Sequence, residues 1–445
     1  RVQRHGTLDG DLIDVRSFRF AAGGPIPVEV TLNSQSFSDV SVRTVLQDLP
    51  SAVNGSTVSF TLPGPGNYYI KYKGLTGMDP VVVFWVDDIN KEGISPGDSG
   101  VVDITTKGVT PNSDSEQTSK IQSAIGDCPD NGILYFPAGV YHTGTISINR
   151  HNITLYFDKG AILYGSASSF GAGLITIQNS KNVKIMGPGT VDCNYANGVQ
   201  GANSTKVVYF EDVEDIYFED TLFKFSPSWA LNVRKGKNVH FKNIKVFSGK
   251  DGIDPDTCQD FLVEDSFVCA IDDGVAVKNR YPPAACERIT IKNSILASVS
   301  SCLKIGTETR GPMRDITFDT CEVFDTDRAI VIYARDGGPI ENCTWKNIRL
   351  HMKHWESEDN AAPFVFQITL RDAPTPVNNI LVENIQTNII SNSYFDGLAE
   401  APLNGLTIRN VQAFVEEPKP DRESNIIFPG NENADVSIEN LTVYW

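Results

Sequence analysis

Three aspartates have the type and spacing that acid–base chemistry needs. Asp251 lies in the segment Lys250–Asp256, and Asp272 and Asp273 lie together in Ala270–Lys278. Asp251 and Asp272 are 21 residues apart, which is close to one turn of a repeating coil. Three carboxylates side by side cannot all ionise easily, so the pKa of one should rise and let it donate a proton. One protonated acid beside one ionised carboxylate is the requirement for hydrolysing a glycosidic bond.

Two simpler interpretations of these aspartates remain open: a solvated acidic turn and a calcium site. The one-coil spacing, and the apolar strand Val275–Val277 directly after the pair, favour a functional cluster. Asp254 is the nearest rival for a catalytic role. We rank it lower because on a strand its side chain has the opposite parity to that of Asp251. We expect neither a metal ion nor a cofactor.

A repeated strand pattern predicts the element that positions the aspartates. Short apolar–polar–apolar triplets, most of them followed closely by Asn or Asp, recur at steps of 22 to 37 residues. They begin at Val183, Ile216, Val239, Phe261, Ile289, Ile316, Cys343, Ile380, Leu406 and Val436. Steps of this size predict the coils of a right-handed parallel β-helix of the pectin-lyase type, with inserted loops where a step is long. A leucine-rich repeat is disfavoured, because Leu is not the repeated residue and no helix pattern separates the strands.

The chain is expected to be all-β and to have two domains. Residues 1–95 alternate apolar and polar positions between Gly and Pro turns, which predicts a small β-sandwich. The run Val81–Val86 reads as a strand buried on both faces. Residues 96–445 form the predicted β-helix, and the one convincing helix, Ser115–Ile125, is expected to cap its open end.

Composition limits the partners and the compartment. A net charge of -17 argues against nucleic acid, and no apolar run is long enough to cross a membrane. Eight cysteines without a Cys-x-x-Cys pair argue against zinc and favour disulfides, with Cys321–Cys343, Cys258–Cys269 and Cys286–Cys302 as candidates. The chain opens at Arg1 without a signal-like stretch, as a mature form would. With sequons at Asn54, Asn152, Asn203, Asn342 and Asn440, this predicts a secreted monomer.

Residues 96–445 resemble glycoside hydrolase family 28, the polygalacturonases and rhamnogalacturonases. The segments that carry the resemblance are Gly132–Tyr141 with Thr143-Gly144, Gly160–Ser166, Gly187–Asp192 and Ser226–Trp229. The family's Asn-Thr-Asp motif falls on Gly249-Lys250-Asp251, and its Asp-Asp motif falls on Asp272-Asp273. The resemblance implies that Asp272 protonates the leaving oxygen while Asp251 and Asp273 activate water, inverting the anomeric centre. Inversion is expected to need roughly 6.5 to 9.5 Å between acid and base.

The chain departs from the polygalacturonases at two places. Their Gly-His-Gly motif has Ser301 at the histidine position, and their Arg-Ile-Lys has no counterpart in Ala329–Tyr333. Rhamnogalacturonases also lack that histidine, so a rhamnogalacturonan-type pectic polymer is the favoured substrate. Residues near the aspartates that could bind it are Lys304, Lys278, Glu308, Arg310, Tyr333, Arg335 and Trp229. Lys304 falls near the family's missing serine, and Trp229 is either a sugar platform or a buried aromatic.

Three alternatives remain at this point. The N-terminal β domain ahead of a β-helix is also similar to the family 49 dextranases and isopullulanases, which keeps neutral α-glucans among the substrates. A polysaccharide lyase or uronate epimerase would use the same fold but abstract a proton beside a carboxylate. A non-catalytic carbohydrate-binding β-helix is the third.

Overall fold

The computed structural model describes residues 3–5, 15–33, 36–73, 81–166, 171–194, 205–353, 361–389, 391–415 and 433–444. The chain divides into two compact units, Arg1–Gly93 and Ile94–Trp445. Each unit has its own hydrophobic core.

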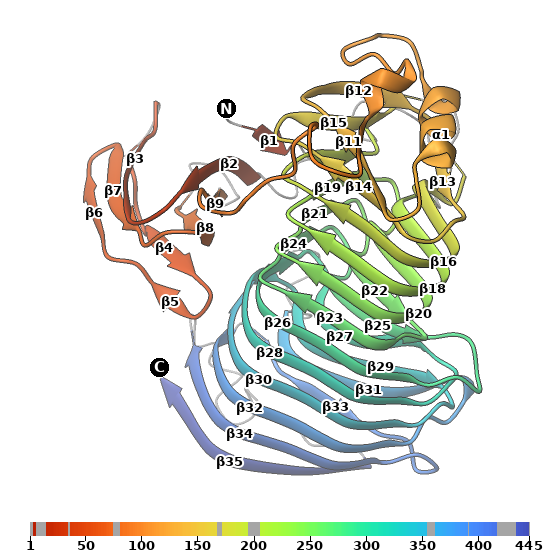
Figure 1. Ribbon diagram of the computed structural model, residues 1–445. Coiled ribbons are helices and arrows are strands. Elements are labelled where there is room, and N and C mark those ends of the chain that lie inside the picture. The colour runs from red at the N-terminus through yellow and green to blue at the C-terminus, as the bar shows by residue number, and fades with distance from the viewer. Residues whose placement is uncertain are drawn as a thin grey trace. The chain divides into compact units, whose positions relative to one another are not determined.

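The first unit is a sandwich of two sheets (Figure 1). One sheet has the order β1 (Gln3–His5), β2 (Val15–Ala22), β9 (Val81–Asp88), β8 (Gly66–Lys71), β4 (Ser41–Thr44) and β5 (Gln47–Asp48). The other has the order β3 (Ile26–Thr31), β7 (Thr57–Leu62) and β6 (Ser51–Asn54). Val81–Val86 is buried throughout, as predicted, and Phe60 meets Phe84 across the sandwich at 5.7 Å between ring centroids. The alternation of apolar residues therefore produces the two facing apolar surfaces that this unit needs.

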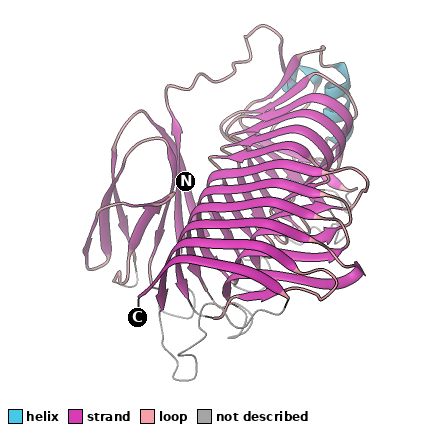
Figure 2. Cartoon of the chain, turned by 90° about the horizontal axis from the view of Figure 1, so that it is seen from below, coloured by secondary structure: helices cyan, strands magenta, loops and turns pink. Residues whose placement is uncertain are grey.

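The second unit is a right-handed parallel β-helix, and nearly all of its pairing is parallel (Figures 1 and 2). Its first wall begins with β10 (Val101–Asp103), β11 (Gly132–Phe136) and β14 (Ile153–Phe157), and β23 (Gln259–Glu264) lies further along. Its second wall contains β12 (Gly139–Thr143), β15 (Ala161–Gly165), β17 (Thr190–Asp192), β19 (Leu222–Ser226), β21 (Lys245–Ser248) and β24 (Phe267–Ala270). Its third wall contains β13 (Ile146–Ile148), β22 (Ile253–Asp256), β25 (Val275–Asn279), β27 (Ser301–Thr309), β29 (Arg328–Asp336), β31 (Ala362–Ala373) and β33 (Tyr394–Asp396).

Long strands bend between walls and complete the coils. They are β16 (Gly173–Met186), β18 (Lys206–Glu219), β20 (Leu231–Lys242), β26 (Cys286–Ser298), β28 (Met313–Thr326), β30 (Ile340–Met352), β32 (Val377–Ile389), β34 (Leu403–Val415) and β35 (Ala434–Tyr444). A short 3-10 helix, η1 (Ile104–Lys107), precedes the helix α1 (Thr118–Asp127). The buried face of α1, Ile121, Ala124 and Ile125, joins the coil core at one end. The predicted cap is therefore confirmed, although the helix begins three residues late because Gln117 bonds the backbone of Thr110 instead.

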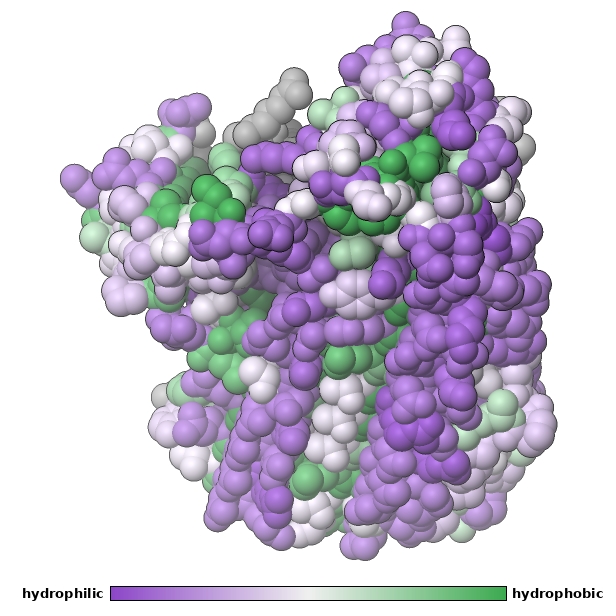
Figure 3. Space-filling model, in the orientation of Figure 1, coloured by the Kyte–Doolittle hydropathy of each residue, from purple (hydrophilic) through white to green (hydrophobic). Residues whose placement is uncertain are grey.

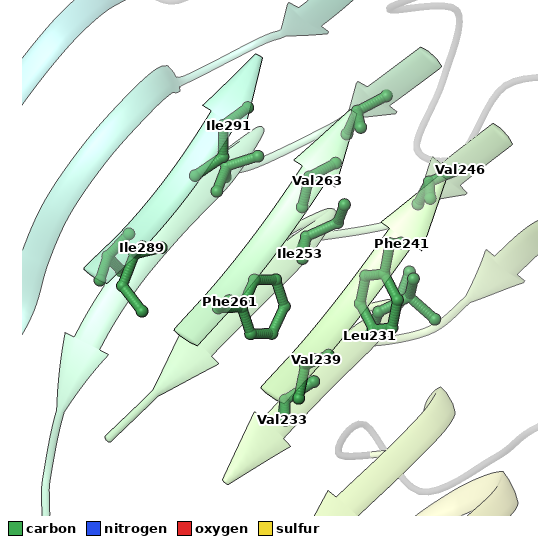
Figure 4. Packing of buried hydrophobic residues seen from close by; sticks show 14 of the residues in the cluster. Leu231, Val233, Val239, Phe241, Val246, Ile253, Phe261, Val263, Ile289 and Ile291 are labelled. Atoms are coloured by element: carbon green, nitrogen blue, oxygen red, sulfur yellow. The ribbon is translucent and has the colours of Figure 1, made fainter. Parts of the chain in front are cut away.

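The repeated triplets are the first wall, stacked residue on residue. Val183 pairs with Ile216, Ile216 with Val239, Val239 with Phe261, and the register continues in the same way to Val436. Their apolar side chains, with those of the third wall such as Leu231 and Ile253, point into the coil (Figure 4). A strand alternates its side chains, so a core on one side leaves a row of polar residues outside. Figure 3 shows such hydrophilic bands running from coil to coil.

The Asn and Asp residues that follow the triplets have the structural role expected of them. They have positive φ and hydrogen-bond to one another from coil to coil, as in Asn243 to Asp220, Asn293 to Asp265, Asn384 to Asn347 and Asn440 to Asn410. Short polar side chains tolerate this left-handed turn. The sequon residues Asn152, Asn342 and Asn440 also hold such bonds, and Asn203 lies outside the described residues.

The predicted disulfides are wrong. All eight cysteines are free and buried. Cys321 pairs in register with Ile348, whereas Cys343 pairs with Ile380, so these two thiols occupy different positions of their coils. Cysteine here behaves as a small apolar residue that fills the coil interior.

Truncating the interior should be costly. Trp345 is fully buried, stacks on Phe318 at 5.4 Å and meets Phe366 at 5.9 Å between ring centroids. We expect Trp345→Ala to lower the free energy of unfolding by about 3–5 kcal/mol, through lost burial and the cavity left behind. Urea unfolding measures this. Leu370→Ala is the control, since Leu370 is 58% exposed, and an equal loss in both variants would contradict the prediction.

Candidate active site

The aspartates project outward from the third wall, where consecutive coils repeat an Asp-Gly-apolar pattern. Ile253 of β22 pairs with Val275 of β25, and both point inward. Each follows a glycine that follows an aspartate, Asp251-Gly252 and Asp273-Gly274. The amide of Gly252 donates to the carbonyl of Asp273, so Asp251 stacks on Asp273 rather than on Asp272. The coil is thus 22 residues long here, one more than the spacing we used.

The two glycines let these coils approach each other. A Cβ on Gly252 would lie 2.5 Å from the carbonyl oxygen of Gly274 and 2.5 Å from Val268. A Cβ on Gly274 would lie 2.8 Å from the carbonyl oxygen of Cys302. Both distances are too short for real contacts, so each aspartate is followed by the only residue that fits.

The structure brings Asp251, Asp272 and Asp273 together. One carboxylate oxygen of each lies within 4.8 Å of the others. Asp251 and Asp273 are buried, whereas Asp272 is exposed. This separation is shorter than the roughly 6.5–9.5 Å expected from an inverting pair. Asp251 stacks on Asp273, where strands lie about 4.8 Å apart, and the proposed acid Asp272 adjoins Asp273 in the chain, so all three carboxylates lie close together.

Lys278 holds Asp251 from the strand that follows the pair. Its ammonium donates to Asp251 Oδ2 at 2.6 Å and to Asp254 Oδ1 at 2.7 Å. All three side chains are buried, and the second oxygen of Asp254 has no hydrogen-bond partner. Asp254 therefore shares the Lys278 ammonium with Asp251. The parity argument was wrong because Asp251 precedes strand β22 and does not follow strand alternation.

Lys304 holds the other buried aspartate. Its ammonium donates to Asp273 Oδ2 at 2.6 Å and lies 5.3 Å from the centre of the Tyr333 ring. The other oxygen of Asp273 is buried without a hydrogen-bond partner. Each buried catalytic candidate thus has one lysine, whereas exposed Asp272 makes no salt bridge within the described residues.

The surroundings raise the pKa of three carboxyl groups, those of Asp254, Asp272 and Asp273, and lower the pKa of Asp251. Burial raises the pKa of Asp272, and the negative charge of Asp251 raises it further. Burial also raises the pKa of Asp273, to about 6, although Lys304 opposes it. Burial acts in the same direction on Asp251, but the charge and hydrogen bond of Lys278 outweigh it and leave the pKa lowered. Burial raises the pKa of Asp254 well above its ordinary value. The cluster therefore holds both a proton donor and an ionised carboxylate.

The other predicted binding residues have partners of their own, and in the described part of the chain only Trp229 among them contacts a side chain that holds an aspartate of the cluster. Trp229 is partly buried, and Lys278 lies 4.0 Å from its ring centre. Glu308 faces Arg280 at 3.6 Å, and Arg310 bonds Asp372 at 2.9 Å. The backbone amide of Arg335 donates to Thr309 Oγ1, and its buried Nε has no hydrogen-bond partner.

Sequence reasoning missed three cations: Lys206 and Arg280, which lie beside the ring of Trp229, and Arg234, which lies over the ring of Tyr209. They come from strand β18, strand β20 and the residue after strand β25. The signal that could have found them is the coil register, which pairs Glu211 with Arg234 and Arg234 with Asp256. Ser301, at the family's histidine position, accepts from Arg328 at 3.2 Å.

No helix among the described residues is long and apolar enough to cross a membrane. The family model described as "Glycosyl hydrolases family 28" matches residues 131–416. A probable polygalacturonase from Vitis vinifera is 22% identical over 66% of this chain and 70% of its own length. A probable rhamnogalacturonase A from Aspergillus oryzae is 23% identical over 64% of this chain and 60% of its own length.

Among solved structures, an exopolygalacturonase from Thermotoga maritima is similar with a TM-score of 0.62 and 16% identity. The match covers 79% of this chain and 93% of that one, and it supports the β-helix fold. The family match spans more than half of the chain and includes the coils that carry the aspartates. The chain therefore belongs to family 28 of the glycosyl hydrolases, enzymes that cleave glycosidic bonds with inversion of the anomeric carbon.

Proposed function

We propose that the protein hydrolyses a pectic polymer, with a rhamnogalacturonan-type backbone as the favoured substrate. The observation that carries the proposal is the group of three aspartates, of which two are buried against lysines and one is exposed. The relatives named for pectic activity support the substrate class. They do not favour a neutral α-glucan, a lyase or epimerase reaction, or a non-catalytic role.

Asp272 is the proposed general acid. Its side chain is the exposed member of the group, so a bound sugar has access to it, and its pKa is raised by burial of its surroundings and by Asp251. It would donate its proton to the leaving glycosidic oxygen as the bond to the anomeric carbon breaks. This step needs one protonated carboxyl group beside an ionised one, which the raised pKa of Asp272 and the lowered pKa of Asp251 provide.

Asp251 and Asp273 are the proposed base. Two hydrogen bonds from one water, each about 2.8 Å long, place their acceptors about 4.5 Å apart. Carboxylate oxygens within 4.8 Å of each other can therefore both accept from the same water. That water would attack the anomeric carbon from the face opposite the leaving group, and its proton would pass to the cluster. Lys278 and Lys304 keep Asp251 and Asp273 in place for it.

Substrate contacts are proposed for Lys304, Lys278, Glu308, Arg310, Tyr333, Arg335 and Trp229, of which Trp229 lies beside Lys278 and Tyr333 beside Lys304. Lys304 and Lys278 act mainly through the carboxylates that they hold. Since pectic polymers are extracellular, we also propose secretion and action as a monomer. Light scattering coupled to gel filtration tests the oligomeric state.

A polymer panel tests the proposal. Wild type is incubated with rhamnogalacturonan, polygalacturonan, xylogalacturonan and dextran, and reducing ends and the anomer of the first product are followed by NMR. We expect cleavage of a galacturonate-containing polymer, inverted product, and an unchanged rate in EDTA. Loss of activity in EDTA would point to a metal site at the three aspartates, and cleavage of dextran alone would refute the pectic substrate.

The rate should depend on pH through the carboxyl cluster. Because these groups interact, they titrate as one set, and the acid must hold a proton while Asp251 is ionised. The lowered pKa of Asp251 places the acidic limb below the ordinary range of aspartate. Burial raises the pKa of Asp272 and raises that of Asp273 to about 6, so the three aspartates should share one proton up to about that pH and lose it above. We expect kcat/KM to fall as pH rises above about 6, and a constant value up to pH 8 would contradict this assignment.

A further inference from the structure

A cluster of positive side chains lies beside the aspartates, in a chain whose net charge is -17. Around the ring of Trp229, Lys278 lies at 4.0 Å, Arg280 at 4.8 Å and Lys206 at 5.2 Å from the ring centre. Trp229 is followed by Ala230, whose amide donates to the carbonyl of Asp251. The cluster therefore adjoins the aspartates one coil toward strands β18 and β20 (Figure 1).

The charges of this cluster are only partly balanced. Lys278 is fully engaged by Asp251 and Asp254. Arg280 has loose ion pairs, 3.4 Å to Asp256 and 3.6 Å to Glu308.

Arg234 bonds neutral groups, Asn232 Oδ1 and the Tyr209 hydroxyl, each at 3.2 Å. Within the described residues it forms no salt bridge. Burial lowers the pKa of Lys206 to about 8, and the positive charges of Arg234, Arg280 and Lys278 contribute to the decrease. The negative charge of Asp254 opposes this decrease.

The two arginines lie where a ligand can reach them. Arg234 and Arg280 are only partly buried, and the aromatic rings of Tyr209 and Trp229 support their guanidinium groups. An aromatic face orients a guanidinium and leaves its edge free to bind. A guanidinium edge matches a carboxylate with two parallel hydrogen bonds, which a neutral sugar hydroxyl does not offer.

We propose that Arg234 and Arg280, with Lys206, form a subsite for the carboxylate of a uronic acid residue next to the bond that is cut. The inference rests on the proposed pectic substrate and specifies which residues read its charge. The strand Ala329–Tyr333 has no Arg or Lys that could do this from the opposite side of the aspartates. The proposed subsite lies on the side of strands β18 and β20.

Measuring the binding of oligosaccharides to a catalytically inactive variant tests the subsite without relying on turnover. In an Asp272→Asn background, calorimetry measures trigalacturonate and an alternating rhamnose–galacturonate tetrasaccharide, each as the free acid and as the methyl ester. Arg234→Gln should weaken binding of the free acids about tenfold or more, since a hydrogen bond between charged groups contributes about 1.5–3 kcal/mol. It should change binding of the esters less than twofold. Arg280→Gln provides a second, independent variant if Arg234→Gln does not fold.

The matched control is Arg409→Gln, which removes an arginine paired with Glu383 on strand β34, away from the aspartates. It should leave both affinities unchanged. Equal weakening of acid and ester would show that Arg234 only supports the local structure and would overturn the subsite. Unchanged binding of the acids would also overturn it. If Arg234→Gln acts as expected but wild type cuts no pectic polymer, the subsite stands and the proposed hydrolysis fails.

Discussion

Asp272→Asn is expected to lower kcat by about 10²–10⁴-fold while substrate affinity and thermal stability stay near those of wild type. Asparagine keeps the shape of the side chain but cannot donate the proton that the leaving oxygen needs. Asp272 is the exposed aspartate and makes no salt bridge among the described residues, so its removal disturbs little else. Initial rates of reducing-end release on the polymer cut best by wild type measure the effect.

A substrate with a better leaving group distinguishes the general acid from the general base. An aryl glycoside whose phenolate leaves without a proton should recover much of the activity in Asp272→Asn, but not in Asp251→Asn. Asp260→Asn is the control, since Asp260 is exposed, pairs with Arg288 and lies on the first wall. Full activity of Asp272→Asn on the polymer would remove Asp272 from the mechanism. Recovery of Asp251→Asn but not of Asp272→Asn on the aryl glycoside would mean that the roles are reversed.

Lys278→Met is expected to destabilise the protein by about 3–5 kcal/mol near neutral pH and to abolish most of its activity. The ammonium is buried between Asp251 and Asp254, and removing it leaves two buried carboxyl groups without their countercharge. In the variant, the folded-state pKa of both carboxyl groups lies above the unfolded value. The loss of folding stability from these two ionised groups is then present above their unfolded pKa and disappears as the pH falls below it. The stability gap from wild type should therefore shrink on acidification.

Urea unfolding of wild type and Lys278→Met at pH 7 and pH 4 checks this expectation. Lys292→Met is the matched control, because Lys292 makes an exposed ion pair with Glu264 at 3.1 Å. Exposed pairs contribute about 0–1 kcal/mol, so this control should change stability little. A loss in Lys278→Met that is small at pH 7, or that grows at pH 4, would contradict the assigned ion pairs.

The β-helix could be read from the sequence because one physical requirement repeats in every coil. Each triplet from Val183 to Val436 must place two apolar side chains in the core, and the structure stacks the triplets in register. The polar residue after a triplet, such as Asn384 or Asn410, must adopt a left-handed turn, which few residue types tolerate. Because these requirements recur in every coil, the residue types that meet them recur at regular intervals in the sequence.

The predicted cysteine pairs and the expected opposite directions of the Asp251 and Asp254 side chains failed for the same reason. Sequence spacing counts residues per coil, but whether two side chains meet depends on their positions within the coil. Cys321 and Cys343 are one coil length apart and still stack on different partners. Asp254 reaches the same ammonium as Asp251 because the chain turns at Gly252 before strand β22 begins.

For the three aspartates, the sequence by itself determined that Asp251 and the Asp272-Asp273 pair lie on one face, since one coil length separates them. The tertiary structure decided which of them is exposed and which lysine each buried carboxylate holds. It also brought Lys206 and Arg280 to the ring of Trp229 and Arg234 to the ring of Tyr209. Periodicity specifies side chains that must enter the core. Outward side chains carry no such repeat, so their charges meet only once the coils are stacked.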